Sequence, residues 1–208
     1  MDAEPLPAKG PRLTAKGQAT RARIVAVASE LMFDGGVAAT GVDDVKAAAG
    51  VSSSQLYHYF ADKRALVSAV VAHQTEQVLS AQEPLLSALD SFESLRIWRD
   101  AIVALQRERA CHGGCPIGSL ASELAERDPE SRHALATGFD RWEEGIRDGL
   151  ERMRERGELR TDADPAALAL ATLAALQGGL LLTQVRRSTA PLEAALDQML
   201  ARIEDQAS

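Results

Sequence analysis

Apolar residues along the chain recur at the spacing of helices rather than strands. Between Thr20 and Gly35 they stand three and four residues apart, which places them on one face of a helix. This stripe comprises Ile24, Val27, Ala28, Leu31 and Met32. The pair Gly35-Gly36 ends the helix, because glycine readily adopts the conformation that terminates helices. Alternating, β-branched stretches typical of strands are few, so the pattern predicts an all-α protein.

A short second helix is expected from Thr40, a residue type that caps helix starts. Its core residues are Val42, Val45 and Ala49, and Gly50 ends it after two turns. Ser52 and Gln55 then have the spacing of a capping box, which opens a third helix. Asp62 is expected to cap a fourth. The apolar side of that fourth helix comprises Leu66, Val70 and Val71.

Prolines and glycines divide the rest of the chain into longer helices and loops, with the first division at Pro84. About nine helices are expected in all. The later segments are Leu85–Arg109 with a break near Ser91, a loop at 111–118, Ser119–Arg127, Pro129–Arg156 closed by Gly157, Ala166–Val185 after the cap Asp164, and a last helix opened by Pro191.

Two short helices joined by a tight glycine turn are typical of a helix-turn-helix, whose second helix enters the major groove of DNA. Leu56 and Phe60 are the expected core anchors of that second helix. Short polar side chains at its start let its backbone approach base edges and phosphates. The side chains expected to face outward are Ser52, Ser53, Ser54, Gln55, Tyr57 and His58.

Lys63 directly follows the expected cap Asp62, where a cation opposes the helix dipole. A DNA phosphate held there by the lysine and by backbone N–H groups would account for it. An ordinary exposed lysine is the alternative.

Charge is distributed unevenly. The formal net charge of −7 argues against non-specific nucleic-acid binding by the whole chain. Residues 1–64 carry eight Lys/Arg and seven Asp/Glu, whereas the remainder is strongly acidic. We expect residues 1–18 to form a basic, disordered arm that touches a polyanion, with a solvated tail as the alternative. Met1–Ala19 has no apolar central segment typical of a signal peptide, so a cytoplasmic location is expected.

The uncharged stretch Ala166–Val185 is long enough to cross a bilayer. Its alanine, glycine, threonine and glutamine content favours a helix inside a soluble protein, and no membrane partner is expected. Such a helix needs cover on two sides, which predicts a homodimer through a four-helix bundle; a wholly intrachain core is the alternative. The expected interface residues are Ala175, Gly178, Gly179, Leu182, Leu192, Leu196, Met199, Leu200 and Ile203.

The first part of the chain resembles the DNA-binding domain of the TetR family of bacterial transcriptional repressors. The resemblance lies in TGVDDV at 40–45, AGVS at 49–52, LYHYF at 56–60, and Lys63 followed by Leu66. It implies a helix-turn-helix domain at 19–66, a ligand-binding and dimerisation domain at 67–208, and a palindromic double-stranded DNA operator. It implies phosphate contacts from Thr40, Ser52, Tyr57 and Lys63, and base contacts from Ser53, Ser54, Gln55 and His58.

Two details refine the resemblance. Many relatives have a lysine where this chain has Ser53, which predicts a weaker phosphate attraction and leaves the base preference open. The second part of the chain resembles the LmrA/YxaF-like subgroup, through GCPIGSLASEL at 114–124 and LAALQGGLLLTQVR at 173–186.

A mostly apolar cavity for a small hydrophobic, ring-containing effector is expected in the second domain. Three of the four aromatic residues beyond residue 60 lie on its long helices. The expected lining residues are Trp98, Leu105, Phe139, Trp142 and Gln177, with ordinary core packing as the alternative for each. The resemblance implies that such a ligand moves the helix Lys63–Ala81 and so changes the spacing of the two recognition helices.

Cys111, His112 and Cys115 could bind a metal or sense oxidation, which leaves a thiol-based regulator as an alternative function. A zinc site usually needs four ligands, and no second Cys/His pair lies nearby in sequence, so no metal or cofactor is expected. The sequence contains no nucleophile elbow, phosphate loop or metalloprotease motif, so no enzyme is expected. A small-molecule-binding protein without a specific DNA target is the remaining alternative.

Overall fold

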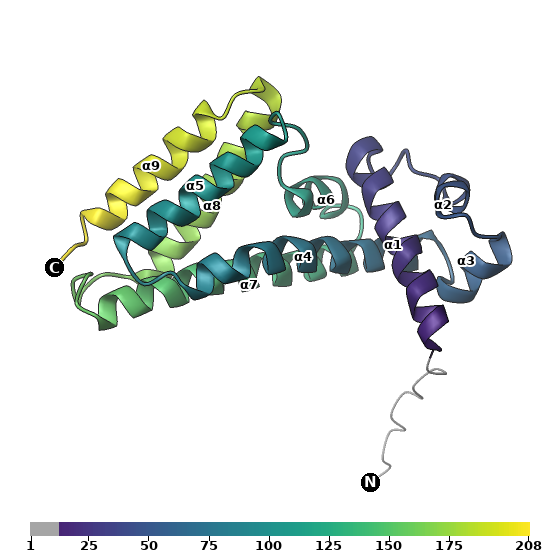
Figure 1. The fold of residues 1–208 in the computed structure, drawn as a ribbon, viewed down its shortest axis with the longest axis horizontal. Coiled ribbons are helices and arrows are strands. Elements are labelled where there is room, and N and C mark those ends of the chain that lie inside the picture. Colours follow the sequence, from purple (N-terminus) through teal and green to yellow (C-terminus); the bar gives the residue numbers. More distant parts are fainter. Residues whose placement is uncertain (1–12) are drawn as a thin grey trace, which may run out of the picture.

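The computed structural model describes residues 13–208, and this part of the chain forms nine helices and no strand (Figure 1). The all-α prediction is therefore confirmed. The helices form a small head at one end and a larger body at the other, and two long helices, α4 and α7, run side by side along the molecule. Leu159 and Ala207 form an isolated antiparallel β-bridge.

The head consists of α1 (Ala15–Gly35), α2 (Val42–Ala49), α3 (Ser53–Tyr59) and the start of α4 (Lys63–Ser87). The body contains the rest of α4. Its other helices are α5 (Phe92–Glu108), α6 (Pro116–Leu124), α7 (Pro129–Glu155), α8 (Pro165–Arg186) and α9 (Ala190–Glu204).

The first helix is longer than its apolar stripe. It begins at Ala15, where the Thr14 side chain accepts a hydrogen bond from the Gly17 backbone N–H over 3.2 Å. Residues 15–18, expected in a disordered arm, are therefore helical. A side-chain cap satisfies an end N–H group without any core contact, which periodicity cannot detect. The rest of the expected arm, residues 1–12, lies outside the described residues.

The cap of α2 lies one residue later than expected. Gly41 is the N-cap, and its backbone N–H donates to the Asp44 carboxylate over 2.8 Å. Thr40 instead turns its hydroxyl to the backbone, donating to the Gly36 carbonyl over 2.8 Å. Thr40, which was expected to cap α2, therefore stabilises the α1–α2 turn instead.

Two proline positions differ from expectation. Pro84 lies inside α4 rather than ending it, and the helix continues to Ser87. The helix lacks one donor there, close to its end, where the loss of a hydrogen bond costs least. Pro116 is the first residue of α6, so residues 116–118 are helical and not part of the expected loop. Proline suits a first helical position, because the N–H that it lacks has no partner there in any helix.

The helix predicted to end at Arg127 ends at Leu124, and the other helix boundaries lie close to the predicted signals. The break near Ser91 is present, and the Ser91 side chain caps α5. Asp164 caps α8, accepting from the N–H groups of Ala166 and Ala167. In the body, α8 packs on α7 and α9, and α9 packs on α5. These contacts bury the middle of the body.

Candidate nucleic-acid interface and ligand cavity

The α2–α3 unit is a helix-turn-helix held by a glycine. Gly50 adopts the left-handed conformation, with φ of 62°, and its N–H donates to carbonyls at the end of α2. Val45 on one helix and Leu56 on the other are fully buried. Phe60 closes the unit at 2 % exposure, with the Arg21 guanidinium 5.1 Å from its ring centre. The turn and its two anchors fix the orientation of α3.

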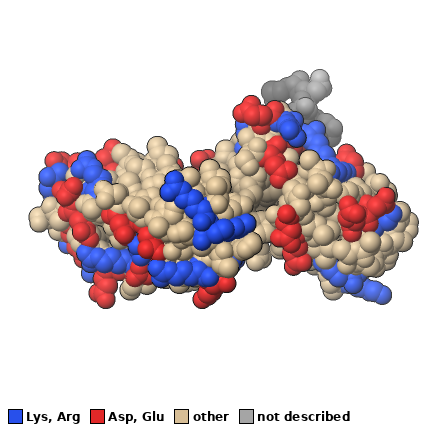
Figure 2. Space-filling model, turned by 90° about the horizontal axis from the view of Figure 1, so that it is seen from above, with Lys and Arg blue, Asp and Glu red and all other residues tan. Residues whose placement is uncertain are grey.

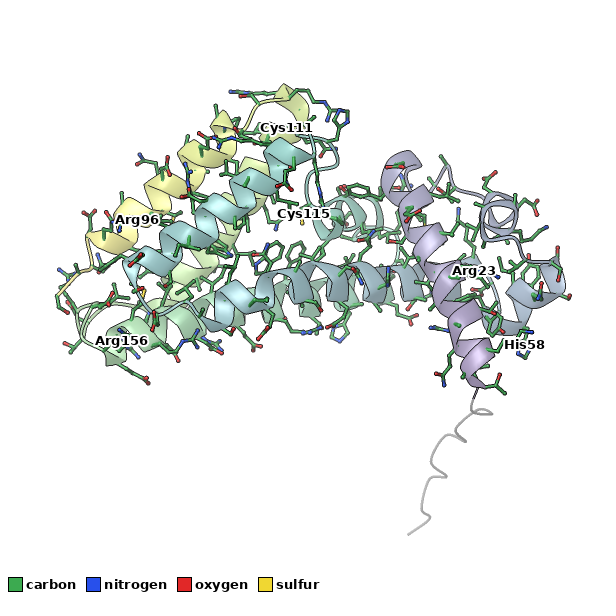
Figure 3. The ribbon with its side chains drawn as sticks, viewed as in Figure 1. Arg23, His58, Arg96, Cys111, Cys115 and Arg156 are labelled. Carbon is green, nitrogen blue, oxygen red and sulfur yellow. The ribbon has the colours of Figure 1, made fainter. Side chains whose placement is uncertain are left out.

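The outward face of α3 carries the side chains predicted for it. Ser52, Ser53, Ser54, Gln55, Tyr57 and His58 are all exposed. The predicted capping box is present, because the Ser52 hydroxyl accepts from the Gln55 N–H and the Gln55 carboxamide oxygen accepts from the Ser52 N–H over 2.9 Å. The Gln55 amide NH₂ takes no part in this box and is left as a donor. Figure 3 shows His58 on this helix and Arg23 on the neighbouring α1.

Two of the predicted phosphate contacts are engaged within the chain. Thr40 is 6 % exposed and hydrogen-bonded to the α1–α2 turn. Lys63 is half-buried, and its Nζ donates to the Val37 carbonyl over 2.8 Å. Both side chains hold the turn that precedes α2. A phosphate contact from either would need its donor to be shared or released.

The head is tied to the body through α6, a contact for which the sequence contains no local signal. One oxygen of the Glu123 carboxylate accepts from the backbone N–H groups of Val37, over 2.9 Å, and Ala38, over 3.4 Å. At the start of α4, Arg64 pairs with Asp128 and Glu130, both at 3.0 Å. These contacts link residues 64 to 86 positions apart in sequence, which is why local patterns do not reveal them.

Surface charge in the body is mixed. Figure 2 shows Lys/Arg and Asp/Glu side chains interspersed over this face of the molecule rather than separated into large patches of one sign. Any attraction of this face to a polyanion is therefore local rather than spread over the whole surface.

A cavity of about 220 Å³ lies in the body between α4, α5, α7, α8 and the start of α6. Leu105 and Trp142, both predicted, line it. The other lining residues are Gln74, Gln77, Val78, Ala81, Gln82, Ile102, Gln106, Arg109, Gly114, Cys115, Pro116, Leu176 and Leu180. The glutamines and Arg109 make this cavity more polar than the sequence suggested.

Three predicted ligand residues lie outside this cavity's lining. Trp98 is fully buried behind it, and its indole N–H donates to the lining residue Gln82 over 2.8 Å. Phe139 packs on the core at partial exposure. Gln177 lines a separate surface hollow of about 410 Å³ between α6 and α8, together with Cys115. The prediction chose these positions because aromatic residues are few in this part of the chain. Large rings fill the core as well as cavities, so the choice included core residues.

The two cysteines are free and buried, and they stand at opposite ends of the α5–α6 connection (Figure 3). Burial raises the pKa of the Cys115 thiol, and the hydrogen bond from the Gly118 backbone N–H opposes that only in part. A thiol with a raised pKa is a poor nucleophile and oxidises reluctantly. No cluster of three or more metal-binding side chains occurs within residues 13–208.

Apolar side chains are exposed mainly on α8. Of the six large hydrophobic residues exposed in the described part of the chain, four lie on this helix: Leu170, Leu181, Leu182 and Val185. The helix is long and apolar enough to cross a membrane, with a mean hydropathy of 1.8 over its most apolar 18 residues. Of that stretch, 44 % is buried against the protein. Its other face is open along its length.

The predicted dimer residues divide into two groups. Leu192, Leu196, Leu200 and Ile203 are buried in the chain's own core, so the stripe on α9 faces inward. Gly179 also faces inward, because an added Cβ would lie 2.9 Å from the Leu192 Cα. Ala175 and Met199 are half-buried, whereas Gly178 and Leu182 are exposed. Of the predicted residues, only Ala175, Gly178, Leu182 and Met199 keep surface that a partner could reach.

Comparisons with known proteins agree with this architecture. Residues 24–70 match the family model described as bacterial regulatory proteins, tetR family, and residues 92–199 match the model described as tetracyclin repressor-like, C-terminal domain. An uncharacterised HTH-type transcriptional regulator of Lactococcus lactis is 26% identical over 193 residues, covering 89% of this chain and 93% of that protein. The repressor DhaR of a Mycobacterium species is 26% identical, covering 83% and 86%.

More distant relatives and solved structures extend the comparison. The regulator YxaF of Bacillus subtilis is 22% identical, covering 90% of this chain and 96% of YxaF. A TetR transcriptional regulator from Chloroflexus aurantiacus has a TM-score of 0.79 at 28% identity, covering 93% of this chain and 98% of that one.

Proposed function

The chain belongs to the tetR family of bacterial regulatory proteins, and from that premise we propose that it is a dimeric repressor released from a palindromic operator by a small ring-containing ligand. The observation that carries the proposal is the outward face of α3, exposed at Ser53, Ser54, Gln55, Tyr57 and His58 on a helix anchored from behind by Leu56. Such a protein acts in the cytoplasm, where the DNA is.

DNA contact is assigned to α3 and its surroundings. Ser53, Ser54, Gln55 and His58 face the base edges, and Ser52 and Tyr57 face the phosphates. Thr40 and Lys63 brace the turn before α2, and Lys63 reaches a phosphate only by sharing its bond to Val37.

The dimer is assigned to the open face of α8. Leu170, Leu181 and Val185 are 57 %, 60 % and 72 % exposed, which is costly for a helix that faces water. A second copy would cover these side chains with its own, because a two-fold interface uses the same surface on both subunits. Two heads held in this way would present two α3 helices to an inverted repeat.

Ligand control is assigned to contacts that run from the cavity to the head. Gln74 lines the cavity and donates to the Ser29 hydroxyl on α1. Gly114 and Pro116 also line the cavity. Gly113, which precedes Gly114, packs so closely on Phe33 of α1 that an added Cβ would lie 2.2 Å from the ring. A ligand that displaces this connection shifts α1 and hence the spacing of the recognition helices.

The control is reciprocal. A ligand that weakens DNA binding must itself bind more weakly, by the same factor, to the DNA-bound protein.

Similarity to YxaF along nearly its whole length supports a finer proposal, that the body belongs to the LmrA/YxaF-like subgroup. A thiol-switch regulator is less favoured, because burial raises the pKa of the Cys115 thiol.

Selection of binding sites from random DNA tests the function. We expect an inverted repeat, bound more weakly as salt rises because bound phosphates release counterions. Recovery of no motif, or of an unpaired half-site by a dimeric protein, would overturn the proposal.

A further inference from the structure

Two buried polar atoms on residues that line the body cavity have no hydrogen-bond partner within the described part of the chain. They are the Gln106 carboxamide oxygen, an acceptor, and the Trp142 indole N–H, a donor. The two residues are 3 % and 2 % exposed. Burial of an unpartnered polar group costs free energy, and a ligand that pairs with it recovers that cost. A hydroxyl group both donates and accepts, so one hydroxyl suits this pair.

Charge in the cavity has one sign. Arg109 is the single charged residue among those that line it, and none of them is acidic. It stands three residues after Gln106 at the end of α5, so the two lie on the same side of that helix. A guanidinium binds a carboxylate through two parallel hydrogen bonds, whereas it repels a cation. The lining therefore selects an anion over an amine.

Size limits the ligand. The cavity volume of about 220 Å³ lies below the range of about 300–1,000 Å³ that is usual for pockets of drug-sized ligands. Val78, Ile102, Leu176 and Leu180 provide apolar walls on three helices. That space suits one aromatic ring with short substituents.

We infer that the cavity binds a single-ring hydroxylated aromatic acid, with its carboxylate at Arg109 and its hydroxyl between Gln106 and Trp142. The inference rests on the proposed function only in naming this molecule as the effector. The binding itself does not depend on DNA.

Titration calorimetry of the full chain with three probes tests the ligand class. The probes are 4-hydroxycinnamate, cinnamate without the hydroxyl, and methyl 4-hydroxycinnamate without the charge. We expect 4-hydroxycinnamate to bind most tightly. Loss of the hydroxyl should weaken binding about tenfold, the usual scale for one buried polar contact. Loss of the charge should weaken it about threefold to fivefold, because Arg109 is exposed and water screens its ion pair. Equal affinities for the three probes, or no binding of any, would overturn the inference.

Two variants assign the groups. Arg109→Gln should bring the acid and its methyl ester to within about twofold of each other, because the charge no longer has a partner. Gln106→Leu should reduce the advantage of 4-hydroxycinnamate over cinnamate, because the hydroxyl keeps only the Trp142 N–H as a partner. Arg132→Gln makes the same charge change on an exposed position of α7 outside the cavity and should leave all three affinities unchanged. If either cavity variant unfolds, the ranking of the probes on the natural chain decides the matter.

A DNA-binding measurement in parallel separates this inference from the proposed function. Binding of 4-hydroxycinnamate without loss of affinity for the selected palindrome supports the ligand class and overturns ligand control. Specific binding of a palindrome by a protein that ignores all three probes supports the DNA-binding function and overturns the ligand class.

Discussion

At the scale of single residues, the head uses polar side chains for its own architecture before any are left for DNA. Thr40 and Lys63 hydrogen-bond to the α1–α2 turn, and Ser52 and the Gln55 oxygen cap α3. The Gln55 amide NH₂ remains as a donor. One side chain thus serves the fold with one atom and can serve recognition with another.

Gln55→Glu separates these two roles. The carboxylate still accepts from the Ser52 N–H, so we expect the thermal midpoint to change little. The donor is lost, so the preference at one or two operator base pairs should fall about tenfold, the scale of a single base contact. Competition binding with single-base operator variants measures this. Because a general charge repulsion affects all sites alike, an unchanged ranking of the variants would show that Gln55 does not read a base.

Glu123 is the residue that joins body to head. Glu123→Ala removes the acceptor for the Val37 and Ala38 N–H groups. Amide hydrogen exchange at these two positions should quicken by about tenfold or more, as expected for a lost bond to a charged acceptor. Glu126→Ala, exposed just beyond the end of α6, is the control. If the exchange rates were the same in both variants, the head would not be held through α6 in solution.

At the scale of helices, adjacent glycines on α8 have opposite surroundings. An added Cβ at Gly179 would lie 2.9 Å from the Leu192 backbone on α9, whereas at Gly178 it would meet nothing within 4 Å in the described residues. Gly179 sets how closely α8 and α9 approach within one chain. Gly178 lies on the open face of α8.

Thermal unfolding of two alanine variants tests this distinction. Gly179→Ala should destabilise the fold by about 1–3 kcal/mol through overpacking. Gly178→Ala should stabilise the isolated chain by about 0.5–1 kcal/mol, because alanine favours a helix more than glycine does. Shifts of the same sign in both variants would contradict the packing of α8 on α9.

At the scale of the whole molecule, one apolar surface of the described residues is not covered by other parts of the chain. The open face of α8 exposes Leu181 and Val185, whereas the stripe on α9 is buried internally. Leu196→Asp would therefore place a charge in the core and unfold the body, and it would say nothing about the dimer.

Val185→Glu is the sharper test of assembly, because this side chain is 72 % exposed. We expect a folded monomer in sedimentation experiments, with affinity for the palindrome reduced by at least tenfold because the second head no longer assists. Ile97→Glu, at a residue 52 % exposed on α5, is the matched control and should remain dimeric. A Val185→Glu protein that is still dimeric would place the interface elsewhere.

The sequence by itself determined the elements and the outward face of α3. Periodic apolar residues, the Ser52–Gln55 capping box, Gly50 and Asp164 act through neighbours within four residues, so their effects can be read locally. For the same reason Leu56 was identified as an anchor and Tyr57 and His58 as exposed.

Only the tertiary structure decided which side chains meet across the chain. A stripe such as that on α9 shows that a face must be covered, but intrachain and interchain cover bury the same residue types, and the sequence could not choose between them. The cavity is lined from residues 74 to 180, and the tie between Glu123 and Val37 spans 86 positions. Such contacts depend on how helices pack, because hydrophobic burial is non-directional and leaves no local spacing to read.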